Sequence, residues 1–537
     1  MPPALFYHIL AERGYEAFFG VPDASMKDFT AYVADHTPPD RHVICANEGN
    51  AVGMAMGYHL ATGKVPVVYM QNAGLGNALD PVMSLAHSDV FRVPMLFVVG
   101  HCGDEKEKKQ VIEPQHLVQG RVTSRTLNCM EVPNSPFHIL TQDNEARLRQ
   151  ELDLADTHFK SAGMPYAFTI GQTYFEPYIK GRLSGFLTSG GQPIEKLLPQ
   201  GADVPPLPGF EDLSQPRTEA HKAAEAENRR EAAEAAARGE DPHGAHTAGE
   251  PAPEAGFTRE EAIRLVLEGI GNDDIVVATT GMAGKEVYDL RARHKAGHFR
   301  DLRVVGGMGH ASSVAAGIAL AMPAAAKAAG RDVVALDGDG SFLMHMGAAA
   351  VTGWVGHRTS VDLATSPDGS SDEPSPTSSP QMGGLGNFKH IVLNNGAHDS
   401  EGGMPTAALF CNLTAIAAAC GYKALEPVEA AKDLPAALAC LRESPGPAFL
   451  EIRIRKGAAS RSLPPQTPKE NKEAFMDFVA KGVTPLLQAK NYISQRLPDS
   501  PIVVLEPERV GEPRRLGIAQ RYKPKQYFHK WKYFYGE

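Results

Sequence analysis

The chain has 537 residues, 43% of them apolar, which is enough for substantial cores in about two to four domains. Its 53 basic and 63 acidic residues give a net charge of −10, and the first 480 residues contain no basic stripe with interleaved aromatics. We therefore expect no nucleic-acid partner. The six cysteines form no C-x-x-C pair and are typical of thiols in a reducing compartment. The Ala-rich stretch 311–329 is broken by Pro323 and Lys327, so we expect no membrane span and a cytoplasmic protein, with an organelle not excluded.

The first 180 residues read as an α/β domain. Helical spacing over 4–13 leads into a predicted strand at 17–19, and a turn at 20–23 precedes a predicted helix at 24–33. Further short apolar runs predict strands at 42–45, 65–70, 94–100 and 167–171. Strands that alternate with helical segments indicate a doubly wound parallel sheet.

Glu48 stands where the predicted strand at 42–45 ends, within A-N-E-G-N-A-V-G-M-A-M-G. Taken alone, such an acidic residue can serve as a helix cap, a solvated group or a ligand contact. Gly49, Gly53 and Gly57 recur at four-residue spacing, so one face of the following helix lacks side chains. Another backbone or a flat ligand could therefore come close to that face.

Two further loops of this domain carry candidate site residues. Gln71 and Asn72 begin the loop Q-N-A-G-L-G-N after the strand at 65–70. This loop could bind a polar ligand or simply connect a strand to a helix. His116 lies in the charged loop after the strand at 94–100, where it is either a substrate contact or a surface histidine.

Residues 181–256 are rich in Gly, Pro, Ala and Glu and read as a low-complexity linker. A second α/β domain is predicted from 257 to 480. A capping box, Thr258-x-x-Glu261, predicts the start of a helix there, and a strand is expected at 275–278. Residues 481–537 form a C-terminal extension with a basic, aromatic end that could bind a partner or pack on the protein's own surface.

The most informative stretch lies between residues 333 and 406. Apolar runs at 333–336 and 390–393 predict buried parallel strands, and they end in G-D-G-S and N-N-G-A-H-D-S. Ligands collect at such strand ends. Asp339 offers a carboxylate oxygen, and Gly338 and Gly340 allow the backbone to approach a ligand. Together with the side-chain amide oxygens of Asn394 and Asn395, this set suits Mg²⁺ carrying a diphosphate. Residues 359–386 lie between the G-D-G-S part and the N-N part of this motif. They are poor in apolar side chains and predict a disordered insertion.

G-D-G-S followed by N-N at a strand end resembles the thiamine-diphosphate signature of the decarboxylase and acetohydroxyacid synthase superfamily. The resemblance implies two thiamine-diphosphate-binding domains, one for the pyrimidine at 1–180 and one for the diphosphate at 257–480. It implies metal ligation by Asp339, Asn395 and the carbonyl of Ala397. It also implies that Glu48 bonds N1′ of the aminopyrimidine and that the thiamine bends over Met308. The other expected cofactor contacts are Gln71, Asn72, Gly338, Gly340 and Ser341.

The motifs V-P-D, N-E-G-N-A-V-G, Y-M-Q-N-A-G-L-G-N, E-P-Q-H, M-G-H-A-S-S and N-N-G-A-H-D-S narrow the resemblance to the phosphonopyruvate decarboxylase family. Sulfopyruvate decarboxylases are its close relatives. The resemblance implies Mg²⁺- and thiamine-diphosphate-dependent decarboxylation of 3-phosphonopyruvate to phosphonoacetaldehyde, in the biosynthesis of phosphonates such as 2-aminoethylphosphonate. It implies catalytic roles for Glu48, His116 and His398, and at least a homodimer with active sites between subunits.

Three other interpretations stay open. The chain could decarboxylate sulfopyruvate, or it could be a carboligating transferase of the acetohydroxyacid synthase kind. The absence of a middle α/β domain from the sequence counts against the transferase. A thiamine-binding protein without catalysis is disfavoured because Glu48, Asp339 and Asn395 are all present.

Overall fold

The computed structural model describes residues 1–103, 114–137, 144–178, 257–323, 326–327, 329–361, 384–457 and 464–481. The predicted linker 181–256 lies outside these ranges, as do most of the predicted insertion and residues 482–537 of the predicted extension 481–537, whose first residue instead ends helix α16 (Pro468–Lys481). Residues 359–361, which we assigned to that insertion, instead complete helix α13 (Gly347–Val361). Among the described helices, none is long and apolar enough to cross a membrane.

The first half of the chain forms a six-stranded sheet in the order β2-β1-β3-β4-β6-β5, and every pairing in it is parallel. Its strands are β1 (Phe18–Gly20), β2 (His42–Ile44), β3 (Val67–Gln71), β4 (Leu96–His101), β5 (Asn134–Phe137) and β6 (Tyr166–Gly171). The connecting helices include α1 (Pro3–Glu12), α2 (Lys27–His36), α3 (Glu48–Thr62), α4 (Leu75–Pro81), the short π-helix η3 (Val82–Ala86), α5 (Pro114–Cys129) and α6 (Asn144–Ser161).

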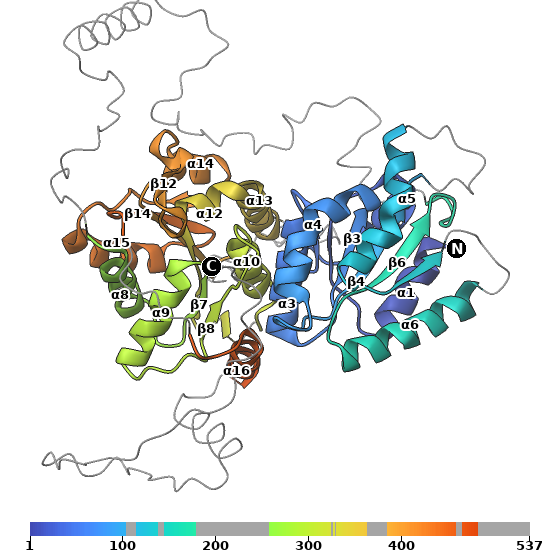
Figure 1. Cartoon of the computed structure of the whole chain (residues 1–537), viewed down its shortest axis with the longest axis horizontal. Coiled ribbons are helices and arrows are strands. Elements are labelled where there is room, and N and C mark those ends of the chain that lie inside the picture. Colours follow the sequence, from blue (N-terminus) through green and yellow to red (C-terminus); the bar gives the residue numbers. More distant parts are fainter. Residues whose placement is uncertain are drawn as a thin grey trace, which may run out of the picture. The chain divides into compact units, whose positions relative to one another are not determined.

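The second half repeats this architecture (Figure 1), with six parallel strands in the order β13-β14-β10-β9-β7-β8. The strands are β7 (Ile275–Ala278), β8 (Asp301–Arg303), β9 (Val333–Gly338), β10 (Phe388–Asn394), β13 (Lys423–Ala424) and β14 (Ala448–Arg453). The helices are α8 (Arg259–Gly269), α9 (Met282–Arg293), α10 (Ala311–Ala321), α12 (Asp339–Met344), α13, α14 (Leu413–Ala419), α15 (Leu434–Glu443) and α16 (Pro468–Lys481). The predicted fold class, two doubly wound parallel sheets, is confirmed.

The inner strands of these sheets bury both of their faces, as the continuous apolar runs predict, whereas the edge strands β5 and β13 leave residues exposed. In β3, Val67 and Tyr69 enter a core shared with α1, α2 and α6, whereas Val68 and Met70 enter a second core shared with α3. This second core continues through α10 to one face of β9. The remaining face of β9 packs in a third core with α8 and α15. One core therefore reaches from the first sheet to the second.

The contact between α3 and α10 depends on the predicted glycine stripe (Figure 1). A Cβ on Gly53 would lie 2.9 Å from Cβ of Ser313, and one on Gly57 would lie 2.7 Å from the backbone nitrogen of Ile318. Side chains at these positions would push the helices apart. Of the two groups that the glycine stripe could admit, another backbone or a flat ligand, the structure places the backbone of α10 against Gly53 and Gly57.

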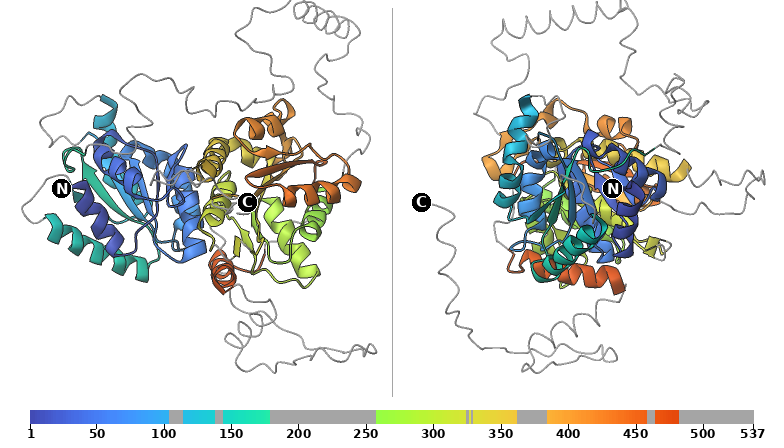
Figure 2. Two further views of the ribbon diagram at one scale, coloured as in Figure 1. Left: turned by 180° about the vertical axis from the view of Figure 1, so that it is seen from behind. Right: turned by 90° about the vertical axis from the view of Figure 1, so that its right-hand side faces the viewer.

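Helix α16 bridges the two halves (Figure 2). The side-chain amide of Asn471 donates to the carbonyl of Asp301 and accepts from the N–H of Arg303, so it occupies the free edge of β8. The next residue, Lys472, donates from Nζ to the carbonyl oxygen of Arg92 in the first half over 2.7 Å. These bonds fix α16 against both halves of the described chain.

Candidate active site

The two motif-bearing strands of the second half lie side by side. Strands β9 and β10 pair in parallel with Gly338 opposite Leu393, so Asp339 and Asn395 follow neighbouring strand ends. The Asp339 carboxylate is buried, and Oδ2 accepts a hydrogen bond from the Thr406 hydroxyl. Burial raises the pKa of Asp339, while hydrogen bonds from Thr406 and from backbone N–H groups oppose that shift. A buried carboxylate of this kind gains from an adjacent cation.

The turn after β10 presents the other predicted metal ligands. Asn395 accepts through Oδ1 from the N–H of Ala397 over 3.1 Å and donates through Nδ2 to Asp399 over 2.8 Å. Within the described residues, no group of three or more His, Cys, Asp or Glu side chains could hold a metal ion. A cation here would have at most two such side chains, among them the Asp339 carboxylate, together with amide and carbonyl oxygens. That donor set fits Mg²⁺, which is often held by one or two carboxylates together with phosphate and water.

Three other predicted residues surround the same turn. The ring of His398 lies directly against Gly340, where a Cβ would be only 2.9 Å from Nδ1 of His398. The structure therefore brings His398 against the G-D-G motif. The hydroxyl of Ser341 has partners inside the domain, Asp337 Oδ1 at 2.8 Å and Thr279 Oγ1 at 2.9 Å. Because the Ser341 hydroxyl is already bonded and the two glycines have no side chain, a diphosphate would contact the backbone of Gly338, Gly340 and Ser341.

Glu48 begins α3 and is 8% exposed. Asn47 caps this helix by accepting the N–H of Asn50 over 2.9 Å. Oε2 of Glu48 accepts from Nδ2 of Asn77 over 2.8 Å, and a side chain at Gly74 would overlap the Glu48 carboxylate. The loop of amides and glycines that follows β3 thus holds Glu48 in one orientation.

Met308 sits in a loop of left-handed glycines before α10. Gly306, Gly307 and Gly309 have φ values of +72°, +52° and +85°, which residues with a side chain rarely adopt. A Cβ on Gly307 would be 2.9 Å from the Leu85 side chain, so this loop packs on η3 of the first half. Met308 is half-buried there.

His310 follows this loop and connects the two halves. Its ring lies against Gly49, the residue after Glu48, where a Cβ would be 2.7 Å from Cε1. Nδ1 of His310 lies 3.4 Å from Nδ2 of Asn50, and its ring stacks on His345 with centroids 4.0 Å apart. Burial, with a smaller effect of His345, lowers the pKa of His310 to about 3. His310 is therefore a neutral ring at physiological pH.

The remaining predicted residues lie at the carboxyl edge of the first sheet. Gln71 donates from Nε2 to Oδ1 of Asp23 over 2.7 Å. Asn72 is buried, and its Nδ2 donates to the carbonyl of Cys102 and the hydroxyl of Thr123, both at 2.9 Å. Asn72 therefore ties β4 to α5. His116 is half-buried in the first turn of α5, whose backbone lies against Gly103 after β4.

Sequence reasoning missed several residues that the structure places at these two edges. Asp23, Asn77, Thr406 and His345 bond or stack with predicted site residues. Asn77 and Thr406 lie within motif stretches, so their position could have drawn attention to them. His345 lies six residues after Asp339 at the end of α12, and only its tertiary contact with His310 reveals it.

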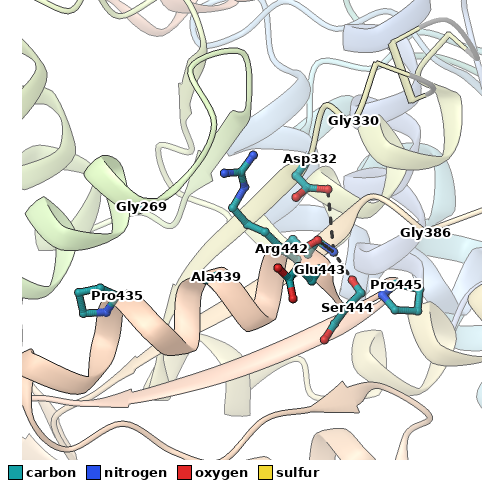
Figure 3. A pocket seen from close by; sticks show the side chains of 11 residues that line it. Gly269, Gly330, Asp332, Gly386, Pro435, Ala439, Arg442, Glu443, Ser444 and Pro445 are labelled. Atoms are coloured by element: carbon teal, nitrogen blue, oxygen red, sulfur yellow. Dashed lines mark hydrogen bonds and ion pairs between the residues drawn. The ribbon is translucent and has the colours of Figure 1, made fainter.

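The cavity in Figure 3 lies at the other end of the second sheet. It has a volume of about 480 Å³, and its lining includes Asp332, Lys389, Arg442 and Ser444. Asp332 precedes β9, whereas Asp339 follows it, so the cavity is at the amino edge of the strands. Burial raises the pKa of Asp332 to about 7, and Lys389 at 3.9 Å opposes that shift. This cavity is separate from the residues described above.

Comparison with known families gives a consistent result. Residues 4–123 match the thiamine pyrophosphate enzyme N-terminal TPP binding domain, and residues 279–353 match the thiamine pyrophosphate enzyme C-terminal TPP binding domain. The chain is 30% identical over 444 residues to a phosphonopyruvate decarboxylase of Streptomyces hygroscopicus, covering 82% of this chain and 85% of that protein.

Two further comparisons extend this picture. Over 170 residues the chain is 30% identical to the sulfopyruvate decarboxylase alpha subunit of Methanococcus maripaludis, covering 32% of this chain and 94% of the subunit. Among solved structures, benzoylformate decarboxylase from Polynucleobacter necessarius superposes with a TM-score of 0.53 at 14% identity. That alignment covers 86% of this chain and 100% of the other, and at this identity it supports the fold alone.

Proposed function

This chain belongs to the phosphonopyruvate decarboxylase family of thiamine diphosphate enzymes, and from that premise we propose that its substrate is 3-phosphonopyruvate. It is a thiamine-diphosphate-dependent decarboxylase, and the proposed products are phosphonoacetaldehyde and carbon dioxide. The aldehyde would then enter the biosynthesis of phosphonates such as 2-aminoethylphosphonate. We also propose a cytoplasmic location, as the cysteine pattern indicates.

One observation carries the proposal. Asp339 and Asn395 follow paired strands of the second sheet, and α10 of the same half brings His310 against Gly49, next to Glu48. The Asp339 carboxylate, which suits a cation, and the Glu48 carboxylate, which suits a heterocycle, thus belong to one packed unit. A cofactor with a diphosphate at one end and an aminopyrimidine at the other needs both.

We assign Mg²⁺ to Asp339, Asn395 and the carbonyl of Ala397, and the diphosphate to the backbone of Gly338, Gly340 and Ser341. When bound, thiamine diphosphate supplies a carbanion at C2 of its thiazolium ring and an electron sink for the departing carboxylate. Met308 would support the bend of the cofactor. Gln71 and Asn72 would contribute through the loop they begin, since the Asn72 amide already has protein partners.

Glu48 is proposed to share a proton with N1′ of the aminopyrimidine. For that role its carboxylate must stay in one orientation and be shielded from water. The bond from Asn77 fixes the orientation, and the 8% exposure of Glu48 limits contact with water. His310 remains uncharged, so it adds no competing cation next to this carboxylate.

The phosphonate group of the substrate would carry up to two negative charges, and such a group favours several hydrogen-bond donors. His398, against the G-D-G motif, and His116, at the start of α5, are the donors that we propose. His310 is a weaker candidate because its pKa of about 3 excludes a charged donor. Sulfopyruvate would offer only a single charge, so these donors favour phosphonopyruvate.

We further propose that the enzyme is at least a homodimer, as the family resemblance implies. Light scattering tests this, and an active monomer would contradict it. Within the described chain α3 already packs on α10 and the ring of His310 lies against Gly49, so the proposed site draws on both halves of one chain. The proposal therefore keeps the homodimer but not the expectation that each active site lies between subunits.

Product analysis tests the reaction itself. The protein is incubated with phosphonopyruvate, thiamine diphosphate and Mg²⁺, and the products are followed by ³¹P NMR and by carbon dioxide release. The proposal predicts stoichiometric phosphonoacetaldehyde and carbon dioxide, even with excess pyruvate present. An acetohydroxy acid formed from the added pyruvate would instead support the carboligating transferase.

A further inference from the structure

Asn395 has its side-chain amide held in one of two possible orientations. An asparagine amide can rotate to exchange its oxygen and nitrogen, and only its hydrogen-bond partners decide between the two states. Nδ2 of Asn395 points at Oδ2 of Asp399, 2.8 Å away. An ionised carboxylate accepts but cannot donate, so it selects the nitrogen and leaves Oδ1 of Asn395 on the other side, where it also accepts from the N–H of Ala397 over 3.1 Å.

Asp399 is itself fixed by donors from distant parts of the chain. The same oxygen, Oδ2, accepts from NH1 of Arg259 over 3.0 Å and from the N–H of Gly457 over 3.2 Å. The side chains of Arg259 and Asp399 are both only 9% exposed. Three donors on one buried oxygen leave the Asp399 carboxylate little freedom to rotate.

Arg259 is held at the start of α8 by two more bonds. Nε donates to Oε2 of Glu286 over 3.1 Å, and NH2 donates to the carbonyl of Gly457 over 3.0 Å. Thr258 caps the same helix by accepting the N–H of Glu261 over 3.1 Å. The guanidinium therefore links α8, α9 and the segment after β14 to the turn that carries Asn395.

We propose that Arg259 and Asp399 are positioning residues that aim the amide oxygen of Asn395 at the metal ion. This inference rests on the metal site proposed above. Groups that bond to metal ligands orient them, and their loss commonly weakens metal affinity about 10- to 100-fold. A purely structural ion pair would stabilise the second half of the chain without affecting metal affinity.

The test uses the full-length protein with saturating thiamine diphosphate and Mn²⁺ as the probe. Mn²⁺ favours the same oxygen ligands as Mg²⁺, and its free form is followed by electron paramagnetic resonance. Asp399→Asn should weaken Mn²⁺ binding about 10- to 100-fold. The turnover number should recover at saturating metal, because the ligand itself is still present.

Glu286→Gln is the matched control. This substitution removes the negative charge that faces the Arg259 guanidinium, but Glu286 does not contact Asn395. It should therefore lower stability without changing Mn²⁺ affinity. Arg259→Lys provides a second variant that keeps the charge but loses the planar fork, and a smaller loss of affinity is expected. Unchanged affinity in the Asp399 and Arg259 variants, or an equal loss in Glu286→Gln, would overturn the positioning role.

Asp339→Ala separates this inference from the metal assignment. If Asp339→Ala abolishes Mn²⁺ binding while Asp399→Asn leaves it intact, the metal site stands and the positioning role is wrong. If Asp339→Ala also leaves binding intact, the metal assignment fails and the positioning role fails with it.

Discussion

Asn77 donates from its side-chain amide to Oε2 of Glu48 over 2.8 Å. The two residues belong to different connections of the first sheet, Glu48 to the start of α3 and Asn77 to the first turn of α4. Gly74 leaves the space that the carboxylate occupies. The loop after β3 therefore orients the acid that the proposed mechanism depends on.

Glu48→Gln should keep the cofactor but slow turnover by at least about a hundredfold, because a neutral amide cannot share a proton with N1′. Calorimetry should give a cofactor affinity within about tenfold of the parent protein. Hydrogen exchange at C2 of the bound cofactor, followed by NMR, should slow in parallel. Fast exchange in this variant would remove the assigned role of Glu48.

His398→Ala should lower kcat/KM for phosphonopyruvate about 10- to 100-fold and change that for pyruvate much less. The lost interaction is a charge-assisted hydrogen bond, worth about 1.5–3 kcal/mol, to a group that pyruvate lacks. The control is His294→Ala, since His294 is exposed at the end of α9. Equal losses on both substrates would indicate that His398 serves proton transfer or folding.

Much of the fold could be predicted because buried parallel strands appear as short apolar runs. The runs at 333–336 and 390–393 became β9 and β10, and their adjacency placed Asp339 close to Asn395. Strands β5 and β8 gave no such signal. They are edge strands with the sequences N-S-P-F and D-L-R, and an edge strand needs neither two apolar faces nor every backbone N–H.

The site was less predictable than the fold where it depends on contacts distant in sequence. The glycine stripe of α3 predicts a close approach but does not identify α10 as the partner. The Arg259–Asp399 ion pair joins residues 140 positions apart, and nothing around Arg259 except the capping box stands out. Such pairs follow from packing, which a single sequence does not encode locally.

Gly57→Ala should destabilise the protein by about 1–3 kcal/mol, since the added methyl group would collide with the backbone of α10, which cannot move aside as a side chain can. Chemical denaturation measures the change. Gly76→Ala in α4 is the control, because no atom other than those of its adjacent residues and its own helix backbone lies within 4 Å of its added Cβ. That variant should be as stable as the parent or up to about 1 kcal/mol more stable. Equal effects of the two substitutions would contradict the close helix contact.

Stability should also fall in mild acid because of His59. This histidine is buried on α3, and burial lowers its pKa from 6.5 to about 4. Between pH 6.5 and 4, His59 is protonated in the unfolded chain but stays neutral in the folded chain. The contribution of His59 to the free energy of unfolding is therefore complete above pH 6.5 and is lost as the pH falls toward 4.

Between pH 7.5 and pH 5, His59 should account for about 2 kcal/mol of lost unfolding free energy. His59→Gln should therefore lose about 2 kcal/mol less than the parent over this interval, as measured by denaturation at both pH values. His294→Gln, a substitution of an exposed histidine, should behave like the parent. An unchanged pH dependence in His59→Gln would show that His59 is not the responsible group.

The most direct test of the proposed function compares kcat/KM for phosphonopyruvate, sulfopyruvate and pyruvate. The three 2-oxoacids are assayed side by side by carbon dioxide release, with saturating Mg²⁺ and thiamine diphosphate. We expect phosphonopyruvate to be preferred over both others, and pyruvate, which lacks the anionic tail, to be the poorest substrate. A preference for sulfopyruvate, or equal values for all three, would contradict the assignment.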